Sequence, residues 1–227
     1  MTHPIRLGII GSSGGSALAA ANDCLIAIGK RIEWVVITDR PCGLETWAAA
    51  KGHAVHRLAY RDAESFSSEA CAIFHAAACN DILLFYTRRV AQPLIDQKRV
   101  WNIHPALLPS FRGLHGVNDA MSAGVRIFGA TLHHVDAGLD TGPIVAQIAA
   151  PLPAGMSLAE AEHLSYLHKV WLTLVWFEHL HTTDLKPDTG YVRPGMVIAS
   201  PGIVDTELRA SYDAFLLRDA EVAIQPA

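Results

Sequence analysis

Short apolar runs alternate with helical segments through the first half of the chain, and this alternation most constrains its fold. Apolar runs predict buried strands at residues 5–11, 32–38, 53–58, 81–86 and 99–103. Segments rich in alanine or with helical stop signals predict helices at residues 17–30, 43–52 and 62–79, the last capped by Asp62. Strands connected by such helices need right-handed crossovers. We therefore expect an α/β, Rossmann-like fold with a mostly parallel sheet covered on both faces.

The second half of the chain predicts one short helix, two further strands and one long helix. The short helix covers residues 116–124, and the strands cover residues 126–135 and 143–150. A loop rich in glycine and aspartate joins these two strands. Ser157 is followed three residues later by Glu160, which is a capping-box signature. A long helix is therefore expected to begin at Ser157.

The sequence changes in character beyond about residue 185. Residues 186–202 contain three prolines and three glycines and have no helical period. We divide the chain into a domain of residues 1–185 and a C-terminal extension of residues 186–227. The extension is expected to form strands or a hairpin that packs on the domain or on a partner. Such strands could support a homodimer.

Composition excludes several classes of protein. The chain of 227 residues is 51% apolar and 18% charged, with a formal net charge of -4, which is typical of a globular domain. It has no basic stripe of the kind that binds nucleic acid. Its apolar runs are too short to span a bilayer, and no signal peptide is recognisable. Four cysteines without a C-x-x-C pair are typical of buried thiols in a reducing compartment, so a cytoplasmic location is expected.

A glycine-rich loop lies between the first strand and the first helix. Its residues Ser13, Gly14, Gly15 and Ser16 match neither the G-x-G-x-x-G fingerprint nor a P-loop, since no lysine follows. Backbone N–H groups at the start of a helix nonetheless favour a phosphate or a carboxylate. We expect these four residues to bind an anion. The alternative is a tight turn that needs glycine for its dihedral angles.

Polar side chains gather at two predicted strand ends. Asn102 and His104 are two residues apart, so a continuing strand points both to one side, at the carboxyl edge where ligands bind in open α/β sheets. Asp140 lies in the loop between the two later strands. An amide and an imidazole can stabilise an oxyanion, and a carboxylate near a histidine can accept a proton. Alternatively, Asn102 caps a turn, His104 is a satisfied buried group, and Asp140 forms an Asx turn onto Gly142.

This combination suits acyl or formyl transfer to an amine. The attacked carbonyl needs donors for its oxyanion, and the attacking nitrogen must lose a proton. No serine or cysteine nucleophile is evident, which favours direct attack by the amine.

The stretches NIHPALLPSFRGLHG and GATLHHVDAGLDTGPIVAQ resemble the folate-dependent formyltransferases, most closely the branch that acts on glycinamide ribonucleotide. Asn102, His104 and Asp140 match the asparagine, histidine and aspartate of that family in order and spacing. The resemblance implies an enzyme with the formyltransferase fold, acting in one-carbon metabolism and purine biosynthesis. It implies 10-formyltetrahydrofolate as formyl donor, a small-molecule amine as acceptor, and no metal.

The resemblance also implies further site residues. Pro105 and the glycine-rich loop would line the acceptor site. The folate would contact residues in and beside the segment after the fourth strand and the loop before Asp140, namely Arg88, Arg89, Val90, His133 and Leu139. Arg88 departs from the family pattern. The two arginines could pair with the glutamate tail of a folate, or form a solvated surface pair. His168 and Lys169 stand where the family has other residues near the acceptor.

Several alternatives stay open from the sequence. The chain could hydrolyse the same folate, although the related deformylases carry an additional N-terminal domain. It could formylate an amino sugar, or bind a folate without catalysis. A metal site at His133, His134 and His163 is disfavoured because adjacent residues of a strand face opposite sides. The sequence does not name the acceptor.

Overall fold

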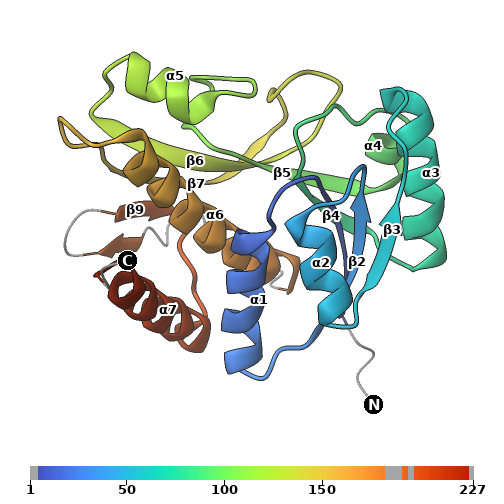
Figure 1. Cartoon of the computed structure of the whole chain (residues 1–227), viewed down its shortest axis with the longest axis horizontal. Coiled ribbons are helices and arrows are strands. Elements are labelled where there is room, and N and C mark those ends of the chain that lie inside the picture. The colour runs from blue at the N-terminus through green and yellow to red at the C-terminus, as the bar shows by residue number, and fades with distance from the viewer. Residues whose placement is uncertain (1–4, 182–190, 194–196, 225–227) are drawn as a thin grey trace.

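The computed structural model describes residues 5–181, 191–193 and 197–224, and its strands form one sheet (Figure 1). The described strands are β1 (Ile5–Gly11), β2 (Ile32–Thr38), β3 (Ala54–Arg57), β4 (Asp81–Phe85), β5 (Arg99–His104), β6 (Ile127–His134), β7 (Ile144–Pro151), β8 (Tyr191–Arg193) and β9 (Val197–Ser200). The helices are α1 (Ser16–Ala27), α2 (Gly43–Ala50), α3 (Ala63–Ala76), α4 (Leu94–Gln97), α5 (Gly116–Ser122), α6 (Leu158–His181) and α7 (Thr206–Ile224).

The sheet has the order β3-β2-β1-β4-β5-β6-β7-β9-β8. Strands β1 to β5 pair in parallel, as the alternation of strands and helices predicts. From β5 onward the neighbours are antiparallel. A loop without a crossover helix joins β6 to β7, as an antiparallel pair permits. The predicted α/β fold is confirmed. The order reverses between β1 and β4, so the carboxyl ends of β1, β4 and β5 meet at one edge, where open α/β sheets bind ligands.

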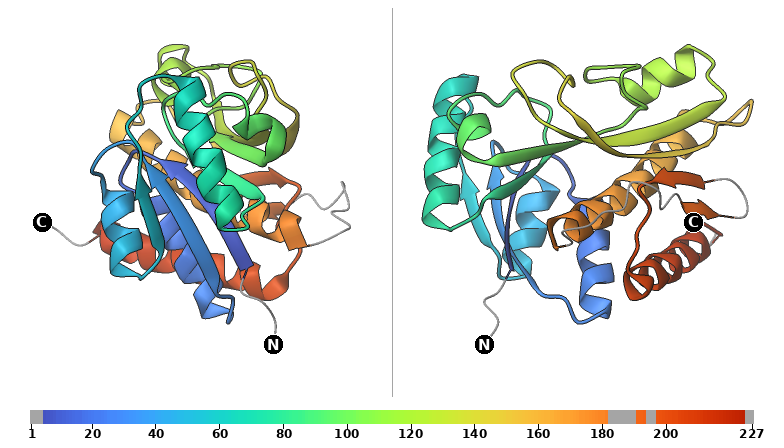
Figure 2. Two further views of the ribbon diagram at one scale, coloured as in Figure 1. Left: turned by 90° about the vertical axis from the view of Figure 1, so that its right-hand side faces the viewer. Right: turned by 180° about the vertical axis from the view of Figure 1, so that it is seen from behind.

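Helices cover both faces of the sheet (Figure 2), and an apolar core of buried side chains lies on each face. Successive residues of a strand point to opposite faces, so in β1 the side chain of Ile9 joins one core and that of Ile10 joins the other. Helices α1, α2, α6 and α7 pack on the face of Ile9, and α3 and α4 pack on the face of Ile10. Both β1 residues are fully buried, which explains why these strands read as continuous apolar runs.

Both predicted helix caps are present. The carboxylate of Asp62 accepts a hydrogen bond from the N–H of Ser65 at 2.7 Å, at the start of α3. At the start of α6, the N–H of Ser157 donates to the carboxylate of Glu160 at 2.7 Å, and the N–H of Glu160 donates to the Ser157 hydroxyl at 3.3 Å. This reciprocal pair is the capping box that the sequence indicates.

The C-terminal extension is only partly as predicted. Strands β8 and β9 form the expected antiparallel pair, and β9 also pairs with β7 at the end of the sheet. The helix α7 was not predicted. Its buried residues Leu208, Tyr212 and Phe215 recur at helical spacing after the last glycine of the extension, and they pack into the core that contains α1 and α6.

A buried carboxylate fixes the start of α7. Glu178, which is 5% exposed on α6, accepts hydrogen bonds from the N–H groups of Val204 and Asp205. Within α7, the hydroxyl of Ser211 donates to the carbonyl oxygen of Cys24 in α1 at 2.9 Å. These contacts attach α7 to α1 and α6. The predicted division of the chain into a domain and an extension at residue 185 stays a prediction. Among the described helices, none has the length and apolarity needed to cross a membrane.

Candidate active site

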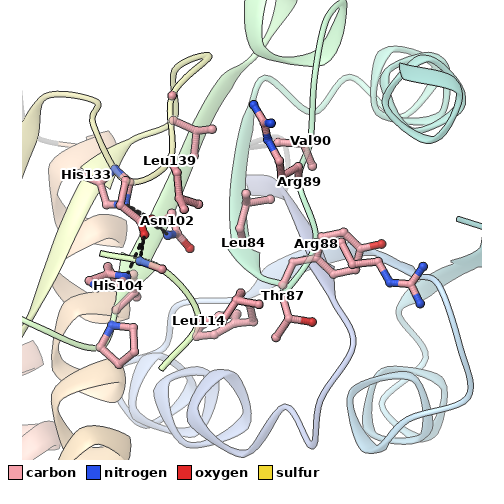
Figure 3. A pocket seen from close by; sticks show the side chains of 18 of the residues that line it. Leu84, Thr87, Arg88, Arg89, Val90, Asn102, His104, Leu114, His133 and Leu139 are labelled. Atoms are coloured by element: carbon pink, nitrogen blue, oxygen red, sulfur yellow. Dashed lines mark hydrogen bonds and ion pairs between the residues drawn. The ribbon is translucent and has the colours of Figure 1, made fainter. Parts of the chain in front are cut away.

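A pocket of about 500 Å³ opens at the carboxyl ends of β1, β4 and β5 (Figure 3). Its walls come from the segment after β4, the end of β5, the loop that follows β5 and the loop between β6 and β7. Asn102, His104 and Asp140 all line it, so the structure brings together the three residues predicted to be catalytic. Asn102 and His104 share a side of β5, as their spacing predicts.

The amide of Asn102 is oriented by a histidine on the neighbouring strand. The antiparallel register of β5 and β6 places His133 directly opposite Asn102. The His133 ring donates from Nδ1 to the carbonyl oxygen of His134 at 2.7 Å, because a carbonyl can only accept. Its Nε2 is therefore free to accept from Nδ2 of Asn102 at 3.1 Å. This arrangement directs the amide nitrogen of Asn102 toward Asp140 as well, at 3.4 Å.

The ring of His104 lies between the carbonyl group of Phe111 and the carboxylate of Asp140. Its Nε2 donates to the carbonyl oxygen of Phe111 at 2.6 Å. Its Nδ1 lies 3.3 Å from Oδ2 of Asp140. In the neutral ring Nε2 carries the single proton, so Nδ1 is an acceptor. When the ring is charged, Nδ1–H donates toward Asp140.

The loop after β5 positions the carbonyl group of Phe111, which accepts the hydrogen bond from His104. The hydroxyl of Thr131 on β6 donates to the carbonyl oxygen of Ala106 and accepts from the N–H of Leu108. The amide of Gln147 on β7 donates to the carbonyl oxygen of Leu108 at 3.0 Å. These contacts from two strands fix the segment that carries Phe111, and with it the orientation of the His104 ring.

Asp140 lines the pocket from the loop between β6 and β7, and hydrogen bonds within this loop fix its conformation. Asp140 has a φ of 52°, in the left-handed region that aspartate tolerates better than most residues. The carboxylate of Asp136 accepts from the N–H of Gly138 and the hydroxyl of Thr141, which closes the loop. Gly142 has no room for a side chain, because a Cβ there would lie 1.9 Å from the carbonyl oxygen of His134. Asp136, and not Asp140, therefore accepts the backbone hydrogen bond of an Asx turn, and the carboxylate of Asp140 lines the pocket.

The carboxylate of Asp140 has contacts on both oxygens. Oδ2 accepts from the N–H of Gly113 at 2.8 Å. Oδ1 lies 3.4 Å from Nδ2 of Asn102 and 3.6 Å from Nε2 of His133. Burial alone would raise the pKa of Asp140, but interaction with His133, the N–H of Gly113 and the nearby imidazoles outweighs it. The pKa of Asp140 therefore lies below its usual value, and the group is a carboxylate at neutral pH.

The ring of His104 is neutral at the same pH. Burial lowers the pKa of His104, and the carboxylate of Asp140 opposes this only in part. A charged carboxylate thus faces the lone pair of a neutral imidazole across 3.3 Å. A proton delivered between them would be stabilised by both groups, so the pair is suited to accept a proton.

All five residues predicted to contact a folate line the pocket, but the two arginines have protein partners. Nε of Arg88 lies 2.9 Å from the buried carboxylate of Asp39, and its guanidinium lies over the ring of Tyr60. Figure 3 shows Arg88 directed away from Asn102 and His104. Nη2 of Arg89 donates to the carbonyl oxygen of Ala137 at 3.1 Å. Neither of the two sequence alternatives, a pairing with a ligand or a solvated surface pair, anticipates these contacts. Val90, His133 and Leu139 complete this set.

Only one of the four residues predicted to bind an anion lines the pocket. Ser13 does so, whereas Gly14, Gly15 and Ser16 are absent from the described lining. Gly15 has a φ of 73°, and a Cβ there would lie 2.8 Å from Cα of Leu44 in α2. The close approach to α2 and the positive φ explain the glycine at position 15, as the tight-turn alternative supposes, whereas a Cβ at Gly14 would meet no atom within 4 Å. Pro105, the remaining residue predicted for the acceptor side, lines the pocket.

Several lining residues were missed, and the histidines of the disfavoured metal site do not come together. The missed residues are mainly apolar side chains with no pattern that separates them from core residues, among them Leu84, Leu114 and Val135. Among the described residues no cluster of three metal-ligating side chains occurs. His134 instead packs against Trp101 in a tilted arrangement with ring centroids 3.9 Å apart, and His163 pairs with Asp219. His168 packs against Phe128, away from the pocket lining.

Comparison with known proteins identifies the family of this chain and several relatives. The model of the formyl transferase family matches residues 9–164. A phosphoribosylglycinamide formyltransferase from Mycobacterium tuberculosis (strain ATCC 25618 / H37Rv) is 37% identical over 158 residues, which are 67% of this chain and 74% of that protein. A phosphoribosylglycinamide formyltransferase from Bacillus subtilis (strain 168) is 47% identical over 64 residues, 27% of this chain and 33% of that protein.

Solved structures are also similar. The crystal structure of phosphoribosylglycinamide formyltransferase from Streptococcus pneumoniae TIGR4 has a TM-score of 0.69 at 26% identity, covering 78% of this chain and 99% of that one. Glycinamide ribonucleotide transformylase 1 from Symbiobacterium toebii has a TM-score of 0.72 at 26% identity, covering 90% and 96%. The resemblance read from the sequence is thereby confirmed, and this chain belongs to the formyl transferase family.

Proposed function

We propose that the chain transfers the formyl group of 10-formyltetrahydrofolate to the amino group of phosphoribosylglycinamide. The observation that carries this proposal is the convergence of Asn102, His104 and Asp140 on one pocket in a member of the formyl transferase family. The names of the relatives support the acceptor, since they are phosphoribosylglycinamide formyltransferases. Asn102, His104 and Asp140 are the proposed catalytic residues.

The two substrates would enter from different sides of the catalytic group. Donor binding is proposed at Arg88, Arg89, Val90, His133 and Leu139, because the flat pterin of a folate needs an apolar slot bounded by a few polar groups. Acceptor binding is proposed on the side of Pro105, with the anion near the loop of Ser13, Gly14, Gly15 and Ser16. The exposed side chain of Ser13 and its place in the lining support this assignment.

The chemistry begins with attack of the acceptor amine on the formyl carbon. A new bond forms between that nitrogen and the carbon, and the carbonyl oxygen becomes an oxyanion. Asn102 is the proposed donor, because its contact with Asp140 at 3.4 Å is long and an oxyanion can replace it at little cost. A positioned donor of this kind lowers the barrier by about 3 kcal/mol.

The attacking nitrogen must then lose a proton. His104 Nδ1 is the proposed acceptor, since its lone pair is unprotonated in the neutral ring and Asp140 stabilises the imidazolium that forms. The intermediate collapses when the bond between N10 of the folate and the formyl carbon breaks. The proton passes from His104 to that N10, so tetrahydrofolate and the formylated amine are released with every atom and charge balanced.

The proposal is tested by following release of tetrahydrofolate from 10-formyltetrahydrofolate. The reaction is run with phosphoribosylglycinamide, with an amino sugar phosphate, and without an amine. We expect release only when phosphoribosylglycinamide is present. Equal release without an amine would make the protein a hydrolase, release with the amino sugar alone would make it a different transferase, and no release in any arm would contradict formyl transfer.

A further inference from the structure

One wall of the pocket is an irregular segment between β4 and α4. We call residues 86–91 the wall segment, and residues 86–90 of it line the pocket. Figure 3 shows Thr87 and Val90 across the pocket from His104 and His133. Connecting segments are in general more mobile than the strands and helices that they join. The shape of this wall therefore depends on what holds the segment from its other side.

The side chain of Arg88 attaches the wall segment to the end of β2. Its Nε lies 2.9 Å from Oδ2 of Asp39, whose side chain is fully buried, and its guanidinium lies 4.6 Å from the centroid of the Tyr60 ring. The hydrogen bond from Arg40, together with the charges of Arg40 and Arg88, holds the pKa of Asp39 below its usual value. Arg88 thus pairs with a carboxylate of the protein and is directed away from the catalytic residues (Figure 3).

Two hydroxyl groups hold the backbone of the same segment. The hydroxyl of Tyr60 donates to the carbonyl oxygen of Arg89 at 3.1 Å. The N–H of Ala91 donates to the hydroxyl of Ser67 at 2.8 Å, and Ser67 is fully buried on α3. Neither Tyr60 nor Ser67 is in the described lining of the pocket. The wall segment is therefore fixed by side chains that a ligand in the pocket does not touch.

Arg89 connects the wall segment to the loop that carries Asp140. Its Nη2 donates to the carbonyl oxygen of Ala137 at 3.1 Å, while its own carbonyl oxygen accepts from Tyr60. The backbone position of Arg89, and with it this bridge between two walls of the pocket, thus depends on the hydroxyl of Tyr60.

We propose that Asp39, Tyr60 and Ser67 are positioning residues for the formyl donor. They hold the wall segment in the conformation that the donor binds, and Arg88 acts through this wall instead of pairing with the anionic tail of the donor. The inference rests on the proposed formyl transfer, which assigns this side of the pocket to the donor. A wall that is already ordered loses less conformational freedom when the donor binds, so loss of one contact weakens donor binding alone.

The kinetic test uses two variants that each remove a single hydroxyl. Tyr60→Phe keeps the ring beneath Arg88, Ser67→Ala removes the acceptor for Ala91, and Ser68→Ala at the exposed neighbouring position of α3 is the control. We expect the KM for 10-formyltetrahydrofolate to rise by about three- to tenfold in Tyr60→Phe and Ser67→Ala. The KM for phosphoribosylglycinamide and kcat should stay within about twofold of wild type, and the control should match wild type. An unchanged donor KM, or an equal rise in both KM values, would overturn the proposal.

A double-mutant cycle separates positioning from direct contact of Arg88 with the donor. Asp39→Asn, Arg88→Met and the double variant are compared with 10-formyltetrahydrofolate and with 10-formyltetrahydropteroate, which lacks the glutamate tail. Each single change should raise the KM for both donors by about fivefold or more, and the double variant should be no worse than either, because one contact is lost in all three. Additive effects, or an effect of Arg88→Met on the donor with the tail alone, would overturn the role given to Arg88.

A binding experiment keeps this inference separate from the proposed function. Tetrahydrofolate is titrated calorimetrically into the wild type, Tyr60→Phe and Ser68→Ala. We expect about three- to tenfold weaker binding to Tyr60→Phe and equal binding to the other two proteins. Equal affinity in all three, or no binding to the wild type, would overturn the positioning role. Absence of turnover by the wild type, with the difference in tetrahydrofolate affinity intact, would count against the proposed formyl transfer alone.

Discussion

The Oδ2 atom of Asp140 lies 3.3 Å from Nδ1 of His104 and 2.8 Å from the N–H of Gly113. One carboxylate thus connects the end of β5, the loop after it and the loop between β6 and β7. Because the other ring nitrogen of His104 is committed to Phe111, the ring can exchange a proton only on the side of Asp140. Catalysis and loop position depend on the same group.

Replacement of Asp140 by asparagine should separate these two roles. Asparagine tolerates the left-handed backbone at this position and keeps an oxygen for the N–H of Gly113. It loses the charge that stabilises the imidazolium of His104. We expect kcat to fall by about 10²- to 10⁴-fold, with a melting temperature close to that of wild type. Steady-state kinetics and calorimetry measure both, and a kcat near the wild-type value would refute the role given to the carboxylate.

Removal of the proposed oxyanion donor or of the proton acceptor should also spare the fold. Asn102→Ala and His104→Ala are each expected to slow turnover by about a hundredfold or more. The circular dichroism spectrum should be unchanged, since both side chains face the pocket. Ser68→Ala, at an exposed position of α3 outside the described lining, serves as the control. A variant of Asn102 or His104 that retains nearly full formyl transfer would reject its assigned role.

The pH dependence follows from His104. Its neutral form is the proposed proton acceptor, and burial lowers its pKa below the usual 6.5. The value of kcat/KM should therefore fall as the pH drops and His104 becomes protonated, with a midpoint below 6.5. Asp140 raises the pKa of His104, so Asp140→Asn should move the acid limb to still lower pH. Profiles of both proteins test this, and a midpoint above 6.5 in the wild type would contradict it.

Gly142 should be required for the loop that carries Asp140. A Cβ at this position would lie 1.9 Å from the carbonyl oxygen of His134, so Gly142→Ala must displace the loop. We expect a loss of about 1–3 kcal/mol in the free energy of unfolding together with a large fall in kcat. Gly14→Ala has open space around its Cβ and should change stability by less than about 0.5 kcal/mol. Urea denaturation measures the free energy of unfolding of both variants. Equal values would contradict this prediction and show that the loop accommodates the added Cβ.

Stability at low pH should depend on His168. The side chain is 1% exposed, both ring nitrogens lack a hydrogen-bond partner in the described structure, and burial lowers its pKa to about 3. The unfolded chain binds a proton near pH 6.5 and the folded one does not, so the free energy of unfolding falls as pH drops from 6.5 toward 3. His168→Leu should reduce that slope by about 1.4 kcal/mol per pH unit. The exposed His56→Gln is the control, and an unaltered slope would contradict the account.

Most of the fold was predictable because the sequence patterns that indicate its strands, helices and caps are short and continuous along the chain. Apolar runs, helix stops and the caps at Asp62 and Ser157 are readable along the chain, and the structure confirms each of them. Helix α7 was missed because prolines and glycines dominate the start of the extension, and its apolar face is only a few residues wide. Whether the extension supports a homodimer stays a prediction.

The site was predictable only where spacing or family resemblance carries the information. Asn102 and His104 were expected on the same side of the strand, because side chains two residues apart on a strand point to the same face. Asp140 was predicted from the family motif. The contact of Gly113 with Asp140 joins two loops, and so does that of Arg88 with Asp39. Such contacts depend on tertiary structure, and no local pattern in the sequence indicates them.

The most direct test of the account is to trace the formyl carbon. Wild-type protein and Asp140→Asn are incubated with 10-formyltetrahydrofolate labelled with carbon-13 in the formyl group, together with phosphoribosylglycinamide, and the products are followed by nuclear magnetic resonance. The account predicts that the label appears as an N-formyl amide in the wild type, and at least about a hundredfold more slowly in the variant. Label recovered as free formate, or transferred equally fast by both proteins, would contradict it.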